Sequence, residues 1–352
     1  MRANSIKSAA QRSGLMSDRG LRTGTLFIVL LAFMSAAQAG ILEAVRERGH
    51  IVCGVAEGQT GFSQTDQSGR WTGIDVEFCT ALAAAVIGDK SAVKFRAIAR
   101  TDGAKALNAG DVDVLLGGLA WTFAREGELG MRAVGVLLHD GQGILIKRSF
   151  GIGSVLELSG STICVASGSS FVQTLNDYFG QRLMRVNLIV ADKWENQIKA
   201  YIEGQCTAMS GPVIRLAIER SRMHTPMDHV LLPELLSLDM SGPMVRQGDD
   251  AWFTIVRWVL FSLIRAEELG LSTANVNEKR QIQESSQINR FLDGTAGLAV
   301  GLMEGWVHRV VEQVGNYADI YERTLGEQSQ LKLSRGRNNL WSGGGLLAAP
   351  AF

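Results

Sequence analysis

The sequence predicts an α/β protein with two domains. Its 352 residues are enough for two separate hydrophobic cores. Forty glycines stand against five prolines, as expected for a chain rich in turns. Short apolar runs alternate with segments of helical spacing, and this alternation favours parallel strands joined by right-handed helical crossovers.

The charge balance gives no support to a nucleic-acid partner or to an anionic membrane surface. Lys and Arg together number 35, and so do Asp and Glu, so the formal net charge is zero. No basic run stands out along the chain. We therefore expect no nucleic acid among the partners.

The first 39 residues have the organisation of a secretory signal peptide. Arg19 and Arg22 precede an apolar run at residues 26–34, and Ala37-Gln38-Ala39 follows as a small-residue cleavage site. The apolar run is too short to span a bilayer in the mature protein. We therefore predict export, with cleavage after Ala39. No cysteine follows that site directly, which argues against a lipid anchor.

The first half of the mature chain is expected to contain three strands. The apolar runs 51–55, 93–98 and 112–116 have the length of buried strands, and short helices are expected at 41–48 and 104–109. A polar, Gly-rich loop follows the first strand. Because ligands bind at the carboxyl ends of parallel strands, the loops after the first and third strands are the places to look for a site.

Residues 73–86 carry the most informative pattern in the chain. Apolar side chains recur there at helical spacing, and Asp75 and Glu77 stand in the first turn, where the helix dipole favours negative charge. The order is Gly73, aliphatic, acid, aliphatic, acid and apolar, followed by a run of small residues. This order resembles the signature of the family 3 extracellular solute-binding proteins, the periplasmic amino-acid receptors of ABC importers.

Later segments extend the resemblance over nearly the whole mature chain. Residues 313–322 resemble the closing helix of these receptors, and residues 339–346, with the insert before them, resemble the general L-amino-acid receptor subgroup. The resemblance implies a type II periplasmic binding protein fold: two lobes, each a mixed sheet flanked by helices, joined by a two-segment hinge. It implies lobe 1 at residues 40–145, lobe 2 at 146–240, and a return to lobe 1 with a C-terminal helical extension at 241–352.

The second lobe is expected to repeat the alternation of strands and helices. Crossings between the lobes are expected at 141–146 and 236–245, and the chain becomes largely helical from Trp252. Arg257 interrupts the apolar run that starts there, so we expect a core helix and no membrane span. The expected elements of lobe 2 are strands at 162–165, 186–190 and 207–209 and helices at 171–179, 193–203 and 213–220.

Export gives the four cysteines a role as disulfides. Four cysteines allow three pairings, and no two of them have the close spacing of a zinc or redox motif. Within the implied fold we favour Cys53 with Cys79 and Cys164 with Cys206, because each pair joins a strand to a neighbouring element without crossing the cleft. Four buried free thiols are the alternative, which fits an oxidising compartment less well.

The resemblance also implies how a ligand is held. Receptors of this family bind the ligand carboxylate through an Arg of lobe 1 and through backbone amides, and Arg125 matches that Arg. A planar guanidinium suits a carboxylate because it donates two parallel hydrogen bonds; the competing interpretation is a solvated Arg in a turn. In lobe 2, Ser169 and Ser170 lie in a strand-to-helix loop that either binds an anion or only caps the helix.

Other pocket positions depart from the family pattern. The family usually has a hydroxyl residue where Ala120 stands and an aromatic residue where Ala104 stands, and the subgroup has Arg and Asn at Gly117 and Gly118. Pro212 stands where the family has an Asp that pairs with the ligand's α-ammonium. Closing a cleft over an unpaired ammonium costs on the order of several kcal/mol, which is most of a micromolar affinity of about 8 kcal/mol.

Two acids are candidates to replace the missing Asp. Glu57, in the first ligand loop of lobe 1, is the better candidate and Asp140 is the second, although each is more commonly a solvated loop acid. Phe62 and Trp121 are candidate walls of the pocket, although aromatic residues at such places more often belong to the core.

The predicted function is the capture of a small carboxylate-bearing solute for the permease of an ABC importer, by hinge closure in the periplasm. The altered pocket predicts that the ligand need not be a standard α-amino acid. The alternatives are a sensor module that has lost amino-acid binding and a dehydratase-like enzyme, which needs a general acid in the cleft. We expect a monomer that is not an enzyme and holds no cofactor or metal, since the five histidines show no metal-ligand spacing.

Overall fold

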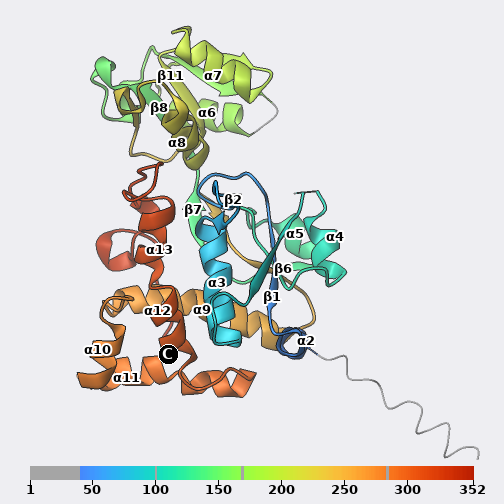
Figure 1. Ribbon diagram of the computed structural model, residues 1–352. Helices are drawn as coiled ribbons and strands as arrows, with labels where there is room; N and C mark the ends of the chain where they lie inside the picture. Colours follow the sequence, from blue (N-terminus) through green and yellow to red (C-terminus); the bar gives the residue numbers. More distant parts are fainter. Residues whose placement is uncertain (1–39, 100, 168–169, 283–284) are drawn as a thin grey trace, which may run out of the picture. The chain divides into compact units, whose positions relative to one another are not determined.

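The structure is a computed structural model that describes residues 40–99, 101–167, 170–282 and 285–352 (Figure 1). The predicted signal peptide and Ser169 lie outside the described residues. Among the described residues, no helix is both long enough and apolar enough to cross a membrane.

Lobe 1 is built on a five-stranded mixed sheet in the order β4-β1-β5-β14-β6. β1 (Ile51–Val55) pairs in parallel with β4 (Val93–Ala97) and with β5 (Val114–Leu115). β14 (Met244–Arg246) runs antiparallel to β5 and to β6 (Met131–Ala133). The expected parallel pairing of the first three strands is confirmed, and the sheet is completed by a strand that returns from beyond lobe 2.

Helix α3 (Ile74–Val86) forms from the stretch of small and apolar residues and is the central helix of lobe 1. It contacts β1 on one side and α9 (Asp250–Glu268), α12 (Trp306–Gln313) and α13 (Tyr317–Thr324) on others, so almost all its side chains are buried (Figure 1). Gly73 precedes it with φ 125°, where an added Cβ would lie 2.2 Å from the carbonyl oxygen of Phe62. A larger residue is therefore excluded at this point of the signature.

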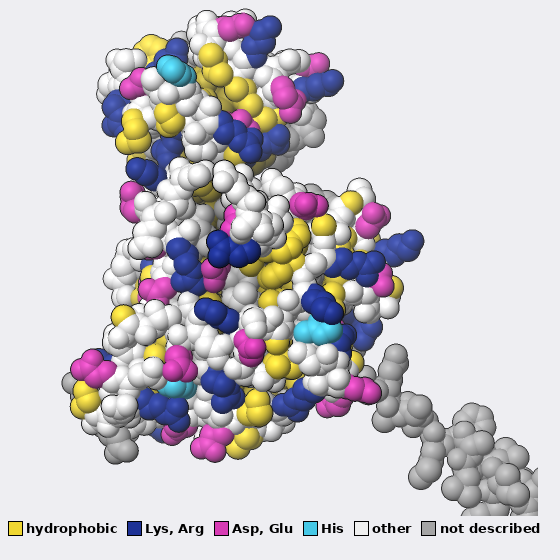
Figure 2. Space-filling model, viewed as in Figure 1, with side chains coloured by type: hydrophobic (Ala, Val, Ile, Leu, Met, Phe, Trp, Pro, Cys, Tyr) yellow, Lys and Arg dark blue, Asp and Glu magenta, His cyan; other side chains and the backbone are white. Residues whose placement is uncertain are grey.

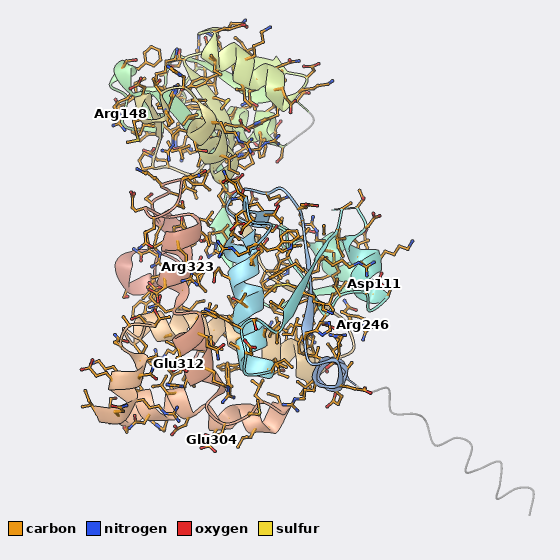
Figure 3. The ribbon with its side chains drawn as sticks, viewed as in Figure 1. Asp111, Arg148, Arg246, Glu304, Glu312 and Arg323 are labelled. Carbon is orange, nitrogen blue, oxygen red and sulfur yellow. A yellow bond between two sulfur atoms is a disulfide. The ribbon has the colours of Figure 1, made fainter. Side chains whose placement is uncertain are left out.

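The acid at position 77 has a tertiary partner besides the helix dipole. Arg323 of α13 binds Glu77 through two hydrogen bonds, of 2.6 Å from Nη2 and 3.0 Å from Nε, and Figure 3 labels this Arg beside α3. Such a bidentate contact joins the closing helix of the chain to its first core helix. The two segments on which the family resemblance rests are thus in direct contact.

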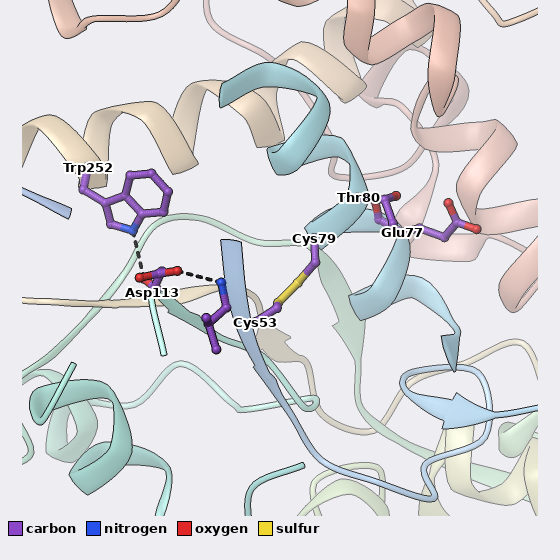
Figure 4. The surroundings of a disulfide bond; sticks show 7 residues. Cys53, Glu77, Cys79, Thr80, Asp113 and Trp252 are labelled. Carbon is purple, nitrogen blue, oxygen red and sulfur yellow. Dashed lines mark hydrogen bonds between the residues drawn. A yellow bond between two sulfur atoms is a disulfide. The ribbon is translucent and has the colours of Figure 1, made fainter. Parts of the chain in front are cut away.

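A disulfide joins α3 to the sheet. Cys53 of β1 is bonded to Cys79 of α3, with 6.4 Å between their Cα atoms (Figure 4). Beside it, the indole Nε1 of Trp252 donates to the carbonyl oxygen of Asp113 at 2.8 Å, and the carboxylate of Asp113 accepts from the amide of Val52 at 2.7 Å. The favoured pairing of the lobe 1 cysteines is confirmed.

Lobe 2 has its own five-stranded sheet, in the order β10-β9-β11-β8-β12. β9 (Thr162–Ala166) pairs in parallel with β10 (Asn187–Ala191) and β11 (Ala208–Pro212). β8 (Gln142–Lys147) runs antiparallel to β11 and to β12 (His229–Leu231). The predicted lobe boundary after residue 145 falls inside β8. Because β8 pairs with strands of the lobe 2 sheet, lobe 2 begins a few residues earlier than predicted.

Apolar side chains form two clusters in lobe 2. Its helices are α6 (Phe171–Gly180), α7 (Trp194–Ile202) and α8 (Val213–Arg222). Ile144, Ile163 and Phe179 belong to one cluster, and Leu145, Tyr201 and Met209 to the other. Residues that alternate along one strand thus enter different clusters, as a sheet covered on both faces requires. The favoured disulfide Cys164–Cys206 lies in the second cluster, with a Cα separation of 5.7 Å, and is confirmed.

Two short strands form the hinge between the lobes. β7 (Leu138–Asp140) pairs antiparallel with β13 (Asp239–Ser241), and the register places Asp140 opposite Asp239. The other edge of β7 is held by the C-terminal extension: Asn338 Oδ1 accepts from the amide of His139 at 2.7 Å, and its Nδ2 donates to the same residue's carbonyl oxygen at 2.8 Å. The Asn338 side chain thus makes the two backbone hydrogen bonds that a neighbouring strand would make with β7.

Several elements differ from those expected. The polar loop after the first strand contains a hairpin of β2 (Gln64–Thr65) and β3 (Trp71–Thr72), so Trp71 lies in a strand before the helix. Helix α5 (Phe123–Gly127) and strand β6 were not expected, because such short segments have no clear periodicity. The remaining helices are α2 (Ile41–Arg48), α4 (Gly103–Asn108), α10 (Val276–Ile282) and α11 (Ser286–Asp293).

Candidate functional site

A cavity of about 670 Å³ lies against both lobes and the hinge strands. Its size is within the range of pockets that bind small molecules. Lobe 1 contributes the loop after β1 and the loop after β5, the two loops that the strand order indicated. The lining residues are Gly58, Gln59, Thr60, Phe62, Gly118, Ala120, Asp140, Pro212, Ile214, Arg215, Ile218, Glu219, Arg222, Asp239, Met240 and Ser241.

The lobe 1 wall is uncharged. The loop after β1 is closed by hydrogen bonds from the amides of Phe62 and Ser63 to the carbonyl oxygen of Gln59, at 3.0 and 2.9 Å. The loop after β5 is attached to the hinge, since Ala120 forms a bridge with Ser241 of β13. Backbone pairing therefore fixes this wall, which has no charged side chain among the lining residues.

Two hinge carboxylates form the floor of the cavity. Asp140 and Asp239 are opposite each other in the β7–β13 pair, and both line the cavity. The pKa of Asp140 is raised from its ordinary 3.8 to about 6, chiefly by burial and to a smaller extent by the charge of Asp239, while hydrogen bonds from the amides of Gly141 and Ile214 oppose the shift. Burial also raises the pKa of Asp239. Removing these carboxylates from water without a cation therefore disfavours their charged form.

One face of α8 forms the lobe 2 wall. Its lining residues stand at relative positions 0, 1, 4, 5 and 8 of the helix, a pattern that places them on one side. Apolar and charged side chains alternate along this face: Ile214, Arg215, Ile218, Glu219 and Arg222. The wall therefore has charge along its length.

Trp194 of α7 organises the charged side chains of this wall. Its ring lies under the guanidinium of Arg215, with 4.1 Å from the guanidinium carbon to the ring centroid, and its Nε1 donates to Glu219 at 3.1 Å. Glu219 in turn lies 3.7 Å from the guanidinium of Arg222. Gly211 allows this packing, since an added Cβ would lie 2.7 Å from the Trp194 ring.

Four of the predicted ligand residues line the cavity. Phe62, Gly118, Ala120 and Pro212 are all in its wall, and so is Asp140, the second candidate for the missing acid. Pro212 ends β11 and directly precedes α8. The Asp140 carboxylate lies at the same helix start, where Oδ1 accepts from the amide of Ile214 at 3.4 Å.

The other predicted residues lie elsewhere. Arg125 is in α5, and its guanidinium donates to the carbonyl oxygen of Ala120 in the cavity wall. Trp121 is 37% exposed, and its amide donates to the carbonyl oxygen of Met240 at 2.7 Å. Glu57 lines a second, smaller cavity of about 350 Å³, with residues of β4 and of the segment after it. Ser170 is exposed directly before α6.

The charged residues of α8 and Asp239 were not among the predicted site residues. The helix at 213–220 was expected, and its spacing alone groups Arg215 with Glu219 and Arg222. The packing of α8 against its own sheet decides which side of the helix faces the cavity. The spacing of residues along the sequence does not predict that packing. Asp239 could be placed only through its pairing with β7.

No group of three or more His, Cys, Asp or Glu side chains could hold a metal ion in the part of the chain that the structure describes. Acidic and basic side chains are mixed over the face seen in Figure 2, without an extended patch of one sign. The visible surface thus agrees with the balanced composition.

Residues 51–272 match the bacterial extracellular solute-binding proteins, family 3. The chain belongs to this family, and the fold class and family resemblance expected from residues 73–86 are confirmed. The family is described as extracellular, and the relatives described next are named as a putative amino-acid ABC transporter-binding protein and a periplasmic amino-acid-binding protein.

Relatives match over nearly the whole chain. A putative amino-acid ABC transporter-binding protein, YhdW of Escherichia coli K12, is 38% identical over 325 residues, which are 92% of this chain and 95% of the relative. The general L-amino acid-binding periplasmic protein AapJ of Rhizobium johnstonii is 40% identical over 326 residues, again 92% and 95%.

A solved structure supports the same architecture. The periplasmic binding protein from Brucella ovis with glutathione bound is 39% identical, with a TM-score of 0.73 over 88% of this chain and 98% of that one. An ancestral cationic amino-acid solute-binding protein at 20% identity and a TM-score of 0.52 shares the fold.

Proposed function

We propose that this chain is the periplasmic substrate-binding component of an amino-acid-type ABC importer. It captures a small solute that carries a carboxylate and passes it to a permease. The named relatives support amino-acid recognition in general, and the cavity has the size and polar groups that such a ligand needs. The predicted signal peptide, cleaved after Ala39, supports action in the periplasm.

The mechanism is closure of the two lobes around the ligand. A ligand that contacts the loops of lobe 1 and the wall on α8 stabilises the closed state, and the closed state docks on the permease. The β7–β13 pair is short enough to act as the hinge. Arg125 and the start of α6 retain the family's two anion-binding segments, and we propose that they receive the ligand carboxylate on closure.

Asp140 takes the role of the acid that Pro212 replaces. The observation that carries this proposal is the position of the Asp140 carboxylate in the cavity wall, at the same helix start that Pro212 precedes. Burial raises the pKa of Asp140, and a ligand ammonium beside it would favour its charged form, which supports this role. Asp239, directly opposite, strengthens the attraction for a cation.

The ligand is not restricted to a single standard amino acid. Ala120 and Gly118 leave the lobe 1 wall without the side chains that the family usually places there, and the cavity is correspondingly roomy. The Brucella ovis relative binds glutathione, a γ-linked tripeptide, on the same fold. We therefore include both amino acids and γ-glutamyl peptides in the proposed range.

Isothermal titration calorimetry of the mature chain, residues 40–352, tests this function. The ligands are the standard amino acids and γ-glutamyl peptides. We expect micromolar binding of at least one, abolished in Arg125→Ala and weakened about 100-fold in Asp140→Asn, since a paired charge in a closed cleft is worth about 3 kcal/mol or more. Glu57→Gln is the matched control and retains the affinity, because Glu57 lines a different cavity.

Three results would contradict the proposal. Absence of binding across the panel would favour a sensor module that has lost its ligand. Equal affinities of Asp140→Asn and the unaltered chain would remove Asp140 from the site. Formation of a dehydrated product from a bound ligand, followed by mass spectrometry, would favour the enzymatic alternative.

A further inference from the structure

We propose that the cavity face of α8 is a second anion subsite, so that the ligand is an extended amino-acid derivative with a distal carboxylate. This inference rests on the proposed function and names its ligand class more closely. The hinge end of the cavity takes the ammonium group of the ligand, and Arg222, at the other end of α8, takes the distal carboxylate.

The length of the charged face supports an extended ligand. From Ile214, whose amide contacts Asp140, to Arg222 the helix advances eight residues, or about 12 Å at about 1.5 Å per residue. A single extended residue spans about 3.5 Å and a chain of three about 10 Å, and the exposed, flexible Arg222 side chain can cover the remaining distance of about 2 Å. A single amino acid therefore cannot reach both the hinge carboxylates and Arg222, whereas a tripeptide can.

The arrangement of side chains around Trp194 prepares this face for an anion. The guanidinium of Arg215 lies over the Trp194 ring, a cation–π contact that restrains it before any ligand arrives. Glu219 is directed toward Trp194 by the 3.1 Å hydrogen bond from Nε1. One oxygen of its carboxylate is therefore engaged, and Arg222 is the guanidinium of this wall that an anion can reach.

Arg222 is the residue best placed to bind the distal group. Its side chain is 61% exposed, and its 3.7 Å separation from Glu219 is longer than a hydrogen bond. A guanidinium in this state can turn toward a carboxylate and donate two hydrogen bonds to it. Because Arg222 is exposed and its contact with Glu219 is long, this ion pair contributes little to stability and costs little to replace.

The charges around the cavity are divided in the way that such a ligand requires. The acids Asp140 and Asp239 stand at the hinge, and Arg222 stands at the far end of α8, with Glu219, which accepts a hydrogen bond from Trp194, between them on the same face. A ligand with an ammonium at one end and a carboxylate at the other matches this order. A γ-linked peptide keeps a free amino-acid head for the hinge end and presents its terminal carboxylate to α8.

Calorimetry with two probes and three variants tests the subsite. The probes are γ-Glu-Ala-Gly and the same peptide with a C-terminal amide, which differ only in the distal carboxylate. We expect the acid to bind the unaltered chain at least about tenfold more tightly than the amide, the usual worth of a hydrogen bond to a charged group. Arg222→Gln should abolish that difference and Arg215→Gln should reduce it.

Arg182→Gln is the control, because this Arg stacks on Tyr178 in lobe 2 and does not line the cavity. It should leave the affinities for both probes unchanged, and L-glutamate should bind the unaltered chain and Arg222→Gln equally. Equal binding of the two probes to the unaltered chain would overturn the distal subsite while leaving the proposed function in place. If neither probe binds but single amino acids do, the distal subsite is again overturned and the proposed function stands. If no ligand binds, both the subsite and the proposed function are overturned.

Discussion

The two lobes are built on similar sheets but differ in what they present to the cavity. Lobe 1 packs its sheet and α3 against the C-terminal helices in one large cluster, with a small second cluster around Leu107 and Leu115, and its cavity wall is uncharged. Lobe 2 has two smaller clusters and a wall in which three of the five α8 residues are charged. The difference indicates that lobe 1 supplies a rigid frame and that lobe 2, together with the hinge, supplies the charges that select a ligand.

The largest expected effect comes from the disulfides. Replacing Cys164 and Cys206 by Ser should lower the free energy of unfolding by about 4 kcal/mol, because the bond closes a loop of 42 residues in the denatured chain. The same change at Cys53 and Cys79, 26 residues apart, should cost about 3.5 kcal/mol. Lobe 2 has the smaller core, so only its variant should unfold in two separate calorimetric transitions; a single shared transition would contradict the comparison.

Acidification should stabilise the free protein through Asp140. Its pKa is raised to about 6 in the folded state from 3.8, so the folded chain binds this proton more tightly than the unfolded chain. The contribution is fully present below about pH 4 and is lost as the pH rises through 6, a change of about 3 kcal/mol. Denaturant melts from pH 4 to 7 should show that fall in the unaltered chain and a smaller one in Asp140→Asn; parallel curves would exclude Asp140 as its source.

Gly211→Ala should disturb the lobe 2 wall. The added methyl group would lie 2.7 Å from the Trp194 ring and displace it from Arg215 and Glu219. Overpacking of this kind costs about 1–3 kcal/mol. Gly180→Ala, in the same lobe with open space around the new Cβ, is the control and should be neutral or stabilising. Thermal denaturation compares the two, and equal melting temperatures would show that the wall can relax.

The smallest effect is expected for Arg222→Gln on stability. The side chain is largely exposed and its ion pair with Glu219 is long, so the free energy of unfolding should change by less than about 0.5 kcal/mol. The same variant is expected to change ligand affinity. Chemical denaturation measures the first quantity; a loss above about 1 kcal/mol would assign Arg222 to the scaffold of lobe 2.

Sequence patterns predicted the elements that depend on local periodicity. The helix at Ile74–Val86 and the strand at Ile51–Val55 were expected within a residue, because buried faces require apolar residues at fixed spacing. The disulfides followed from export and from the implied lobes. The short segments α5, β2 and β3 were missed, because two to five residues contain too little periodicity to be distinguished from a loop.

The candidate site was predicted only in part. Pro212, Phe62, Gly118 and Ala120 were identified through the family resemblance and do line the cavity. Glu57 was preferred to Asp140 from its position in a loop, yet the structure assigns the two acids to different cavities. Sequence order cannot distinguish them, because each follows an apolar segment and only the paths of the neighbouring strands separate them.

The sequence by itself determined the class of this protein, since a receptor fold of this kind is specified by core helices, strand order and cysteines that each depend on local pattern. The tertiary structure decided which charges meet. Asp140 and Asp239 are 99 positions apart along the chain, and the antiparallel register of β7 and β13 places them opposite each other. Asn338, from the last segment, holds β7 in place. Contacts of this kind depend on backbone pairing between segments far apart in the sequence, which no local sequence pattern predicts.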